Sequence, residues 1–570
     1  MLTSVWDDIQ SVLDDAKTPR EKEVQVDGQP KTITTPFPSP PDWRDQWIYF
    51  LMVDRFNNPD RPPDHRPYDT QTGRFQGGTL DGVRQQLGYL KALGVGAIWL
   101  TPVLKNCQYL NTFYGYGIQD FLQIDPRFAT DSENPDAELQ ALIDEAHARG
   151  MYVIFDVVLN HTGDVFAYLA DDRYYEKAPF QSARYPVRWR DNEGQPNERW
   201  DDVPDRERAE LHPDAIVWPQ ELQGNQYFRQ QGSGGESGGD FESLKELVTG
   251  RPEVRNTLIR IHQYLIAKYD VDGFRIDTLK YIEPDFARIF GNAMREYALR
   301  IGKKNFFTFG EVYDDEQTIA HFIGRHALEK DDRTGVDAAL DFPLFYKLPR
   351  MIKGQRVTPA EIANVFEVRK QVQRGIISSH GEVSKYFVTF LDNHDQRDRF
   401  YYQDPAAPHA YDDQVTIGLA CLFTLQGIPC IYYGTEQGLS GSGNSDQAVR
   451  YGRQYFRPLS GDGRTFGLST FSPGVLAYSR ILSDEEVVVV ANTDVDRHVS
   501  LFVIVDYALN PDRSRFHVRY SNKEAPTEPD PVETRSGDVT IHEVDGRLSG
   551  GVARVVKVTL QPMEVQVLGA

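Results

Sequence analysis

The chain has 570 residues, of which 40% are hydrophobic and 26% are charged. This composition is typical of a soluble globular protein, and the length predicts one large domain with one or more smaller ones. The formal net charge of −22 would repel phosphate groups and anionic lipid, which argues against nucleic acids and membrane surfaces as partners.

The sequence also bears on location. It contains no run of about 18 apolar residues, and residues 1–20 lack the basic start and apolar core of a signal peptide. The three cysteines, Cys107, Cys421 and Cys430, match no metal-binding spacing and are too few and odd in number for a disulfide framework. We therefore expect a cytoplasmic protein without a membrane span.

The chain opens with an extension, residues 1–45, which includes the stiff proline-rich stretch 36–41. Buried-strand patterns follow at residues 47–56, 97–101 and 152–160, with apolar residues at helical spacing between them. These strands are nearly continuous apolar runs, which is typical of a parallel sheet covered on both faces.

The strand–helix alternation stops at residues 162–250, which are polar and rich in turns, so we expect an inserted domain B there. Five more strand patterns follow, at residues 273–278, 306–312, 338–343, 386–392 and 430–434. Eight strands alternating with helices predict a (β/α)8 TIM barrel built from residues 46–161 and 251–464. Short β-rich runs in residues 465–570 predict a C-terminal antiparallel β-sandwich domain.

Four of the predicted strands end in polar residues, at positions 156–161, 275–277, 311 and 392–395. Barrel enzymes carry their active sites at the C-terminal ends of the strands, so these side chains would converge on one rim. Any one carboxylate among 84 acidic residues could equally belong to a structural ion pair. Four polar clusters at buried strand ends are harder to explain structurally, because buried charge is costly unless it is paired or functional.

The strand at residues 273–278 is the most informative. Side chains alternate along a strand, so Arg275 and Asp277 share the interior face. A neighbouring guanidinium favours the ionised carboxylate that a nucleophile requires. Glu311 follows an apolar run, and partial burial would favour the protonated form that a general acid requires. Two such carboxyl groups form a glycosidase pair, at a separation of roughly 5–5.5 Å when configuration is retained.

These motifs together resemble those of the α-amylase family, glycoside hydrolase family 13, over about residues 45–465. The stretches that carry the resemblance are DVVLNH at 156–161, GFRIDTLKY at 273–281, FGEVYD at 309–314, FLDNHD at 390–395, GYGIQDF at 115–121 and GIPCIYYGTEQ at 427–437. The resemblance implies a barrel with domain B inserted after the third strand. It also implies a retaining mechanism with a covalent glycosyl-enzyme intermediate and no cofactor in the chemistry.

The resemblance implies roles for individual residues. Asp277 would be the nucleophile, Glu311 the acid/base, and Asp395 the third carboxylate, which grips sugar hydroxyls. The residues that would orient Asp277 or contact the sugar are Arg275, His161, His394, Tyr116 and Lys280.

The chain departs from the family pattern in two places. Tyr114 stands where members commonly have a sugar-binding histidine, which indicates altered specificity or transfer activity. Members often bind a structural calcium beside domain B, and the candidate ligands here are Asn160 and Glu246. Lys245 and Glu246 replace a Pro-Asp pair, and a neighbouring lysine is unfavourable for a cation, so the resemblance leaves calcium open.

The leading hypothesis is an enzyme that hydrolyses α-1,4-glucosidic bonds in starch, glycogen or maltooligosaccharides. The alternative is a transglycosylase of the same family, which would pass the glucosyl group to a sugar instead of water. A catalytically inactive sugar-binding or scaffold protein is a third reading, since fold does not imply function. The presence of Asp277, Glu311 and Asp395 argues against it.

Overall fold

The computed structural model of the chain comprises two compact units. The first contains Met1–Tyr313, His321–Arg325 and Glu329–Ala339, and the second contains Asp314–Ala320, His326–Leu328 and Leu340–Ala570. The structure describes all residues except 1, 7–8, 61–74, 179–183, 202, 204–209, 233–237, 329–334, 374–382, 397–398, 401–411, 437–452, 483–484, 543–547 and 570. Gln437, the last residue of the GIPCIYYGTEQ stretch, therefore lies outside the described residues.

Eight parallel strands form the nearly closed (β/α)8 barrel that the sequence predicts, in the sheet order β15-β14-β13-β7-β4-β3-β17-β16. Six of them belong to the first unit: β3 (Ile48–Leu51), β4 (Ala97–Leu100), β7 (Tyr152–Val158), β13 (Gly273–Asp277), β14 (Phe307–Gly310) and β15 (Ala338–Ala339). The second unit contains β16 (Val388–Thr389) and β17 (Ile428–Tyr432).

Most of the predicted strands are shorter than expected, and two of them give way to a helix. Residues 53–56 form the helix α2 (Val53–Phe56), in which the carboxylate of Asp54 accepts the backbone N–H groups of Gln76 and Gly77. Only β15 is extended within residues 338–343, because the side chain of Asp341 accepts the Leu344 N–H and begins the helix α10 (Phe342–Phe345). An apolar run alone does not distinguish a buried strand from a short buried helix.

The helices of the first unit alternate with its strands. They include α3 (Leu80–Gln85), α4 (Leu87–Ala92), α5 (Pro135–Ala148), α7 (Pro252–Tyr269) and α8 (Pro284–Arg300). The last three begin at a proline, which suits the first helical turn because its missing N–H would have no partner there. Among the described residues, no helix is both long and apolar enough to cross a membrane.

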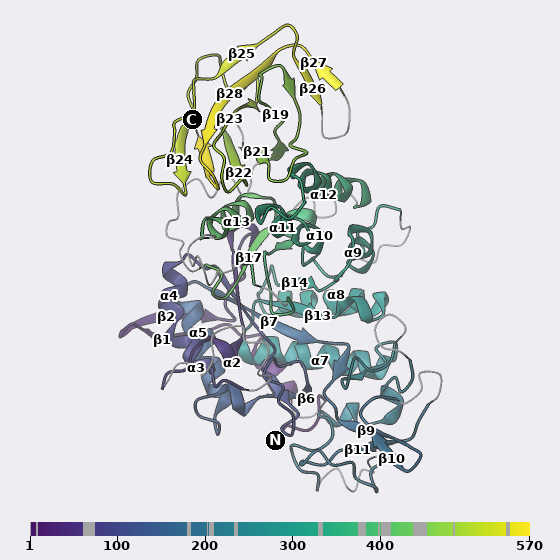
Figure 1. The fold of residues 1–570 in the computed structure, drawn as a ribbon. Helices are drawn as coiled ribbons and strands as arrows, with labels where there is room; N and C mark the ends of the chain where they lie inside the picture. The colour runs from purple at the N-terminus through teal and green to yellow at the C-terminus, as the bar shows by residue number, and fades with distance from the viewer. Residues whose placement is uncertain are drawn as a thin grey trace. The chain divides into compact units, whose positions relative to one another are not determined.

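The segment after β7 is an excursion from the barrel, as predicted. Its strands β9 (Phe166–Ala170), β10 (Arg173–Tyr175) and β11 (Val187–Trp189) form a small antiparallel sheet (Figure 1). The short strand β8 (His161–Thr162) pairs with β12 (Lys245–Glu246), which joins the outgoing and returning ends of the insert. Within the described part of the segment, no strand enters the barrel sheet. The domain bounds themselves stay predictions.

The N-terminal extension has structure of its own. It contains the helix α1 (Gln10–Asp15) and a hairpin of β1 (Arg20–Val26) and β2 (Gln29–Thr35). Past the hairpin, Phe37 stacks on the His147 ring of α5 with a centroid distance of 4.2 Å, and its N–H donates to Asp270 at 2.7 Å. These contacts tie the proline-rich stretch to the ends of α5 and α7.

The C-terminal part of the second unit is built from antiparallel sheets. The five-stranded sheet contains β18 (Arg453–Phe456), β21 (Val475–Leu482), β22 (Glu485–Asn492), β29 (Val565–Gly569) and β24 (His517–Ser521). The four-stranded sheet contains β19 (Leu459–Ser460), β23 (Val499–Val505), β28 (Ala553–Leu560) and β25 (Glu533–Arg535). Val488, Val503 and Val556 belong to one apolar core that residues of both sheets share, which is the arrangement of a β-sandwich.

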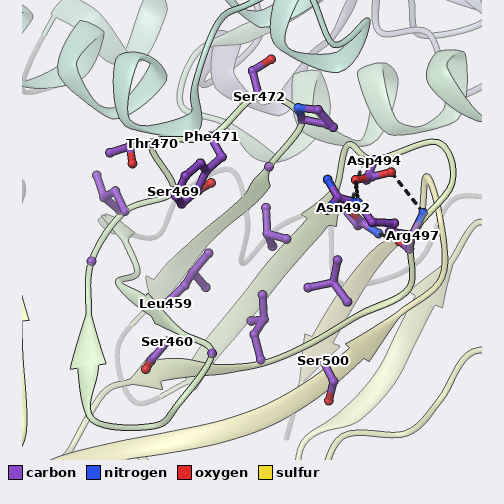
Figure 2. A pocket seen from close by; sticks show the side chains of 18 of the residues that line it. Leu459, Ser460, Ser469, Thr470, Phe471, Ser472, Asn492, Asp494, Arg497 and Ser500 are labelled. Carbon is purple, nitrogen blue, oxygen red and sulfur yellow. Dashed lines mark hydrogen bonds and ion pairs between the residues drawn. The ribbon is translucent and has the colours of Figure 1, made fainter.

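A groove of about 840 Å³ lies on these C-terminal sheets. Figure 2 shows Ser469 and Phe471 on one side of it and Asn492, Asp494 and Arg497 on the other. The Asp494 carboxylate accepts a hydrogen bond from Nε of Arg497 at 2.7 Å, so these two charges satisfy each other. No residue predicted for the active site lines this groove, so the predicted chemistry belongs elsewhere.

All three cysteines are buried and form no disulfide. Burial raises the pKa of the Cys107 thiol in the first unit to about 12. It also raises the pKa of Cys421, on the helix α13 (Asp412–Thr424) of the second unit, to about 12.

Candidate active site

The centre of the predicted site in the first unit is the Arg275 side chain, which β13 holds fully buried. Its Nη1 lies 2.8 Å from Oδ1 of Asp156 and 2.8 Å from Oδ1 of Asp277. Its Nη2 lies 2.9 Å from Oε2 of Glu311. One guanidinium therefore gathers three carboxylates, and charge-assisted bonds of this kind are stronger than neutral ones.

The strand register explains this convergence. β13 pairs in parallel with β7 and β14, so Arg275 lies opposite Asp156 on one side and Phe309 on the other. Asp277 follows two residues later on the same face of the strand. Glu311 is the first residue after β14, and its N–H donates to the Ile276 carbonyl at 2.9 Å. The structure thus brings together Asp277 and Glu311, as the sequence predicts.

A strained residue helps to position Glu311. Thr278, directly after Asp277, has φ = +48°, a left-handed conformation that costs a non-glycine residue about 1–3 kcal/mol. In that conformation its backbone N–H donates to Oε2 of Glu311 at 3.0 Å. The side chain of Glu311 keeps 15% of its surface exposed, so it can reach a bound molecule.

Asp156 is a member of this cluster for which the sequence analysis gave no role. It accepts hydrogen bonds from the Tyr116 hydroxyl at 2.8 Å and from Nε1 of Trp99 at 3.1 Å, besides Arg275. Burial is the main cause that raises the pKa of Asp156 to about 7, and the charge of Asp277 adds to it while Arg275 opposes it. Its position at the start of the DVVLNH stretch was the signal that could have identified it.

The two predicted tyrosines lie beside this cluster. Tyr114 and Tyr116 stack with a centroid distance of 6.0 Å, and the Tyr116 hydroxyl is held by Asp156. Burial raises the pKa of Tyr114 above its usual value, so its hydroxyl is neutral. Gly115 between them has φ = +90°, and a Cβ there would lie 2.0 Å from the Pro102 carbonyl oxygen. The turn that aims both rings therefore requires glycine.

His161 and Lys280 are the other residues of the first unit that the sequence predicts for the site. His161 is buried, and burial lowers its pKa to about 4, so its imidazole is neutral. Its ring is parallel to that of Phe241, with centroids 6.5 Å apart. Lys280 is partly exposed on the turn Leu279–Tyr281 after β13, and its Nζ lies 6.0 Å from the Tyr281 ring centroid.

The FLDNHD stretch belongs to the second unit. Asp392 is structural there, because it binds Nε of Arg399 at 3.0 Å and the Thr435 hydroxyl at 2.9 Å. The side chain of Asp395 is instead 50% exposed, and its Oδ1 lies 3.4 Å from Nε2 of His394. Of the two aspartates in this stretch, Asp395 is the one available to a ligand.

Asn160 and Glu246 do not fit a calcium ion. Glu246 is buried, and its two carboxylate oxygens already accept hydrogen bonds from Nε of Arg229 and from the backbone N–H of Gly239. Asn160 contributes a buried side-chain oxygen that has no hydrogen-bond partner among the described residues. Calcium takes six to eight oxygen ligands, several of them carboxylates, and this pair offers one uncommitted oxygen. Among the residues that the structure describes, no group of three or more aspartate, glutamate, histidine or cysteine side chains could hold a metal ion.

Known proteins similar to this chain point to one family. A model of the alpha-amylase catalytic domain matches residues 50–464. An alpha-amylase of Streptomyces lividans is 33% identical over 414 residues, a match that covers 67% of this chain and 42% of that protein. A cyclomaltodextrin glucanotransferase of Klebsiella oxytoca is 24% identical over 431 residues, covering 69% of this chain and 58% of that protein. The chain thus spans less than two thirds of the length of either relative.

Solved structures share the fold. A crystal structure of the alpha-amylase from Geobacillus thermoleovorans in complex with acarbose has a TM-score of 0.59 at 23% identity, and covers 93% of this chain and 99% of that one. The gamma-CGTase from alkalophilic Bacillus clarkii has a TM-score of 0.61 at 20% identity, covering 93% and 71%. With the family model matching most of its length and the carboxylate cluster at the strand ends, the chain belongs to the α-amylase family of glycoside hydrolases, family 13.

Proposed function

We propose that this protein is a retaining enzyme that cleaves α-1,4-glucosidic bonds in starch, glycogen or maltooligosaccharides. The observation that carries the proposal is the binding of Asp277 and Glu311 to the two terminal nitrogens of Arg275. Their carboxyl groups are therefore neighbours, which the retaining mechanism requires at roughly 5–5.5 Å. The acarbose complex of the Geobacillus relative supports an α-glucan as substrate class.

In the first step, the Asp277 carboxylate forms a bond to the anomeric carbon while the bond from that carbon to the leaving oxygen breaks. The Glu311 proton passes to the leaving oxygen, which releases one chain and leaves Glu311 ionised. The contact of 2.8 Å from Arg275 supports this role, because it stabilises the anionic form of Asp277 before the attack.

In the second step, Glu311 takes a proton from a water molecule, whose oxygen bonds to the anomeric carbon as the ester to Asp277 breaks. Two displacements at one carbon retain its configuration, and both carboxyl groups return to their starting states. By the family resemblance, the half-exposed Asp395 would accept hydrogen bonds from sugar hydroxyls, and His394 and the neutral His161 would hydrogen-bond the sugar at the scissile position.

A transglycosylase is the second candidate. It would use the same glycosyl-enzyme but admit a sugar hydroxyl instead of water in the second step. The observation that favours it is the aromatic pair of Tyr114 and Tyr116, which places a second ring where the family commonly has a histidine. The similarity to a glucanotransferase is compatible with this alternative.

Chromatography of the products from maltoheptaose, with and without added glucose as acceptor, tests both candidates. Hydrolysis yields shorter maltooligosaccharides in either case, whereas transfer yields new products that depend on the acceptor. Parallel reactions with pullulan and sucrose test for other linkages. Unchanged maltoheptaose under all conditions would overturn the α-1,4-glucan proposal.

A further inference from the structure

A lysine is buried where the insert returns to the barrel. Lys245 on β12 is 0% exposed, and its Nζ lies 3.1 Å from Oδ1 of Asp164 and 3.2 Å from Oδ2 of Asp240. The same Nζ donates to the backbone carbonyl of Glu176. An ammonium so deeply buried is tolerated only when oxygens replace its water, and here three oxygens do so.

Two aromatic rings complete the enclosure. The Nζ lies 5.1 Å from the ring centroid of Phe166 and 5.0 Å from that of Tyr168, both on β9. The faces of aromatic rings attract cations, and more strongly where water is excluded. The surroundings are therefore built to hold a positive charge at one point.

This point lies at the junction of the insert with the barrel. β12 pairs with β8, so that Lys245 lies opposite Thr162, and the Leu247 N–H donates to the Asn160 carbonyl at 2.8 Å. Asp164 is two residues past β8, whereas Asp240 belongs to the returning end of the insert. The ammonium therefore links the segment that leaves the barrel to the one that comes back.

Each buried carboxylate described at this junction has a cation as its partner. Asp164 and Asp240 bind Lys245, the second oxygen of Asp164 lies 2.9 Å from Arg190, and Glu246 lies 2.9 Å from Arg229. Arg229 is partly exposed and also lies 3.6 Å from Glu283. Because these carboxylates are already paired and both oxygens of Glu246 are committed, the residues argue against a bound metal beside the lysine.

We propose that the Lys245 ammonium is a built-in cation that replaces a structural metal at this junction. Removing it uncovers a latent calcium site formed by Asp164, Asp240 and the Glu176 carbonyl. Calcium binds oxygens at 2.3–2.6 Å and tolerates irregular geometry, so small side-chain movements and water would complete the site. Magnesium needs shorter and nearly octahedral contacts, so it should fit less well.

Two substitutions separate the charge from the space it occupies. Lys245→Ala removes the ammonium and leaves room for an ion, whereas Lys245→Met removes the charge but fills the volume of the lysine stem. Lys105→Ala is the matched control, because Lys105 is also buried and its Nζ lies 2.6 Å from Asp214, far from the junction in sequence.

Melting temperatures are measured for each full-length protein after chelation and again with added calcium or magnesium. We expect wild type to be unaffected by chelator or calcium. Lys245→Ala and Lys245→Met should both melt several degrees lower after chelation. Calcium should restore Lys245→Ala, magnesium should restore it less, and neither ion should restore Lys245→Met or Lys105→Ala. Calorimetric titration should detect calcium binding to Lys245→Ala alone.

Each contrary result overturns the proposal. Loss of stability by wild type on chelation, with recovery in calcium, would show that a metal is bound despite the lysine. A Lys245→Ala protein as stable as wild type would show that the ammonium does not stabilise the junction. A destabilised Lys245→Ala that binds no calcium would refute the latent site. If Lys245→Ala fails to fold in chelator, its soluble yield is measured after refolding with and without calcium. A yield that calcium does not raise would refute the latent site.

Discussion

At the scale of single residues, Arg275 defines the site by holding Asp277 and Glu311 together. We predict that Asp277→Asn lowers kcat by about a thousandfold or more, while maltooligosaccharide binding survives, because the amide keeps the shape but lacks the charge that attacks the anomeric carbon. Calorimetric binding and initial rates measure the two effects separately.

Two controls accompany that experiment. Thermal melting distinguishes an inactive site from an unfolded protein, since Arg275 would lose one of its three carboxyl partners. Mass spectrometry excludes deamidation of the new Asn back to Asp. A folded variant that still cleaves maltooligosaccharides at near the wild-type rate would show that Asp277 is not the nucleophile.

Asp156 gives a prediction about pH. Its pKa is raised from 3.8 to about 7, so the folded protein binds a proton there that the unfolded chain releases between about pH 4 and pH 7. The contribution of Asp156 to stability is therefore present at low pH and is lost as pH rises through about 7. Asp156→Asn mimics the protonated form and should gain in melting temperature relative to wild type over that window.

Melting curves of wild type and Asp156→Asn from about pH 4 to pH 8 measure this difference directly. Other carboxylates titrate in both proteins. The informative quantity is therefore how the difference in melting temperature between the two proteins changes with pH. A constant difference across the series would mean that Asp156 is ionised throughout, with Arg275 outweighing burial.

At the scale of elements, the turn at Gly115 determines where Tyr114 and Tyr116 lie. We predict that Gly115→Ala lowers the free energy of unfolding by clearly more than the roughly 1–3 kcal/mol that a left-handed φ costs alanine, because its Cβ would also clash with the Pro102 carbonyl. Activity should fall with it, since the Tyr116 hydroxyl would leave Asp156.

Gly28, in the hairpin between β1 and β2, is the matched control. It also has a positive φ, +75°, but a Cβ there would meet no atom within 4 Å. Gly28→Ala should therefore show the backbone cost alone and keep full activity. Chemical denaturation of both variants provides the comparison, and equal losses would contradict the steric argument at Gly115.

The sequence could predict the elements with a long regular pattern and those ending in polar motifs. The barrel strands, the insert after β7 and the neighbouring positions of Arg275 and Asp277 follow from periodicity and alternation. Helix α2 could not be predicted, because its apolar residues resemble a strand and the partners of Asp54, Gln76 and Gly77, come from a distant part of the chain.

The same limit applies to tertiary charge pairing. Lys245 looked merely unfavourable for a cation site in the sequence, because its partner Asp164 is brought to it only by the strand pair β8–β12. Asp156 was missed for a similar reason, since its partners Trp99, Tyr116 and Arg275 come from separate parts of the chain.

At the scale of the whole molecule, the C-terminal sheets support the helices that precede them in the second unit. Tyr478 on β21 is buried, and its hydroxyl bonds that of Thr424 on α13. Arg480 donates to the Thr424 carbonyl at 3.3 Å. We predict that a chain ending near Pro458 is insoluble or melts well below the full-length protein, because α13 would lose this cover. Soluble yield and melting temperature measure the effect.

The groove offers a control for that prediction, because Phe471 at its edge is 77% exposed. Phe471→Ala should leave the melting temperature nearly unchanged, since substitution of an exposed side chain rarely matters to stability. A truncated chain that is stable but inactive would contradict the supporting role and would assign the C-terminal residues a part in the chemistry instead.

The buried cysteines give each unit its own kinetic reporter. Thiol reagents attack the thiolate, which burial makes scarce by raising the pKa of Cys107 and Cys421 to about 12. The rate of alkylation in the native protein should therefore be limited by local opening of the structure around each cysteine. Cys107 reports on the first unit, and Cys421 and Cys430 report on the second. Peptide mapping after timed labelling would rank the two opening rates within one sample. It would thus show which unit opens first without any engineered probe.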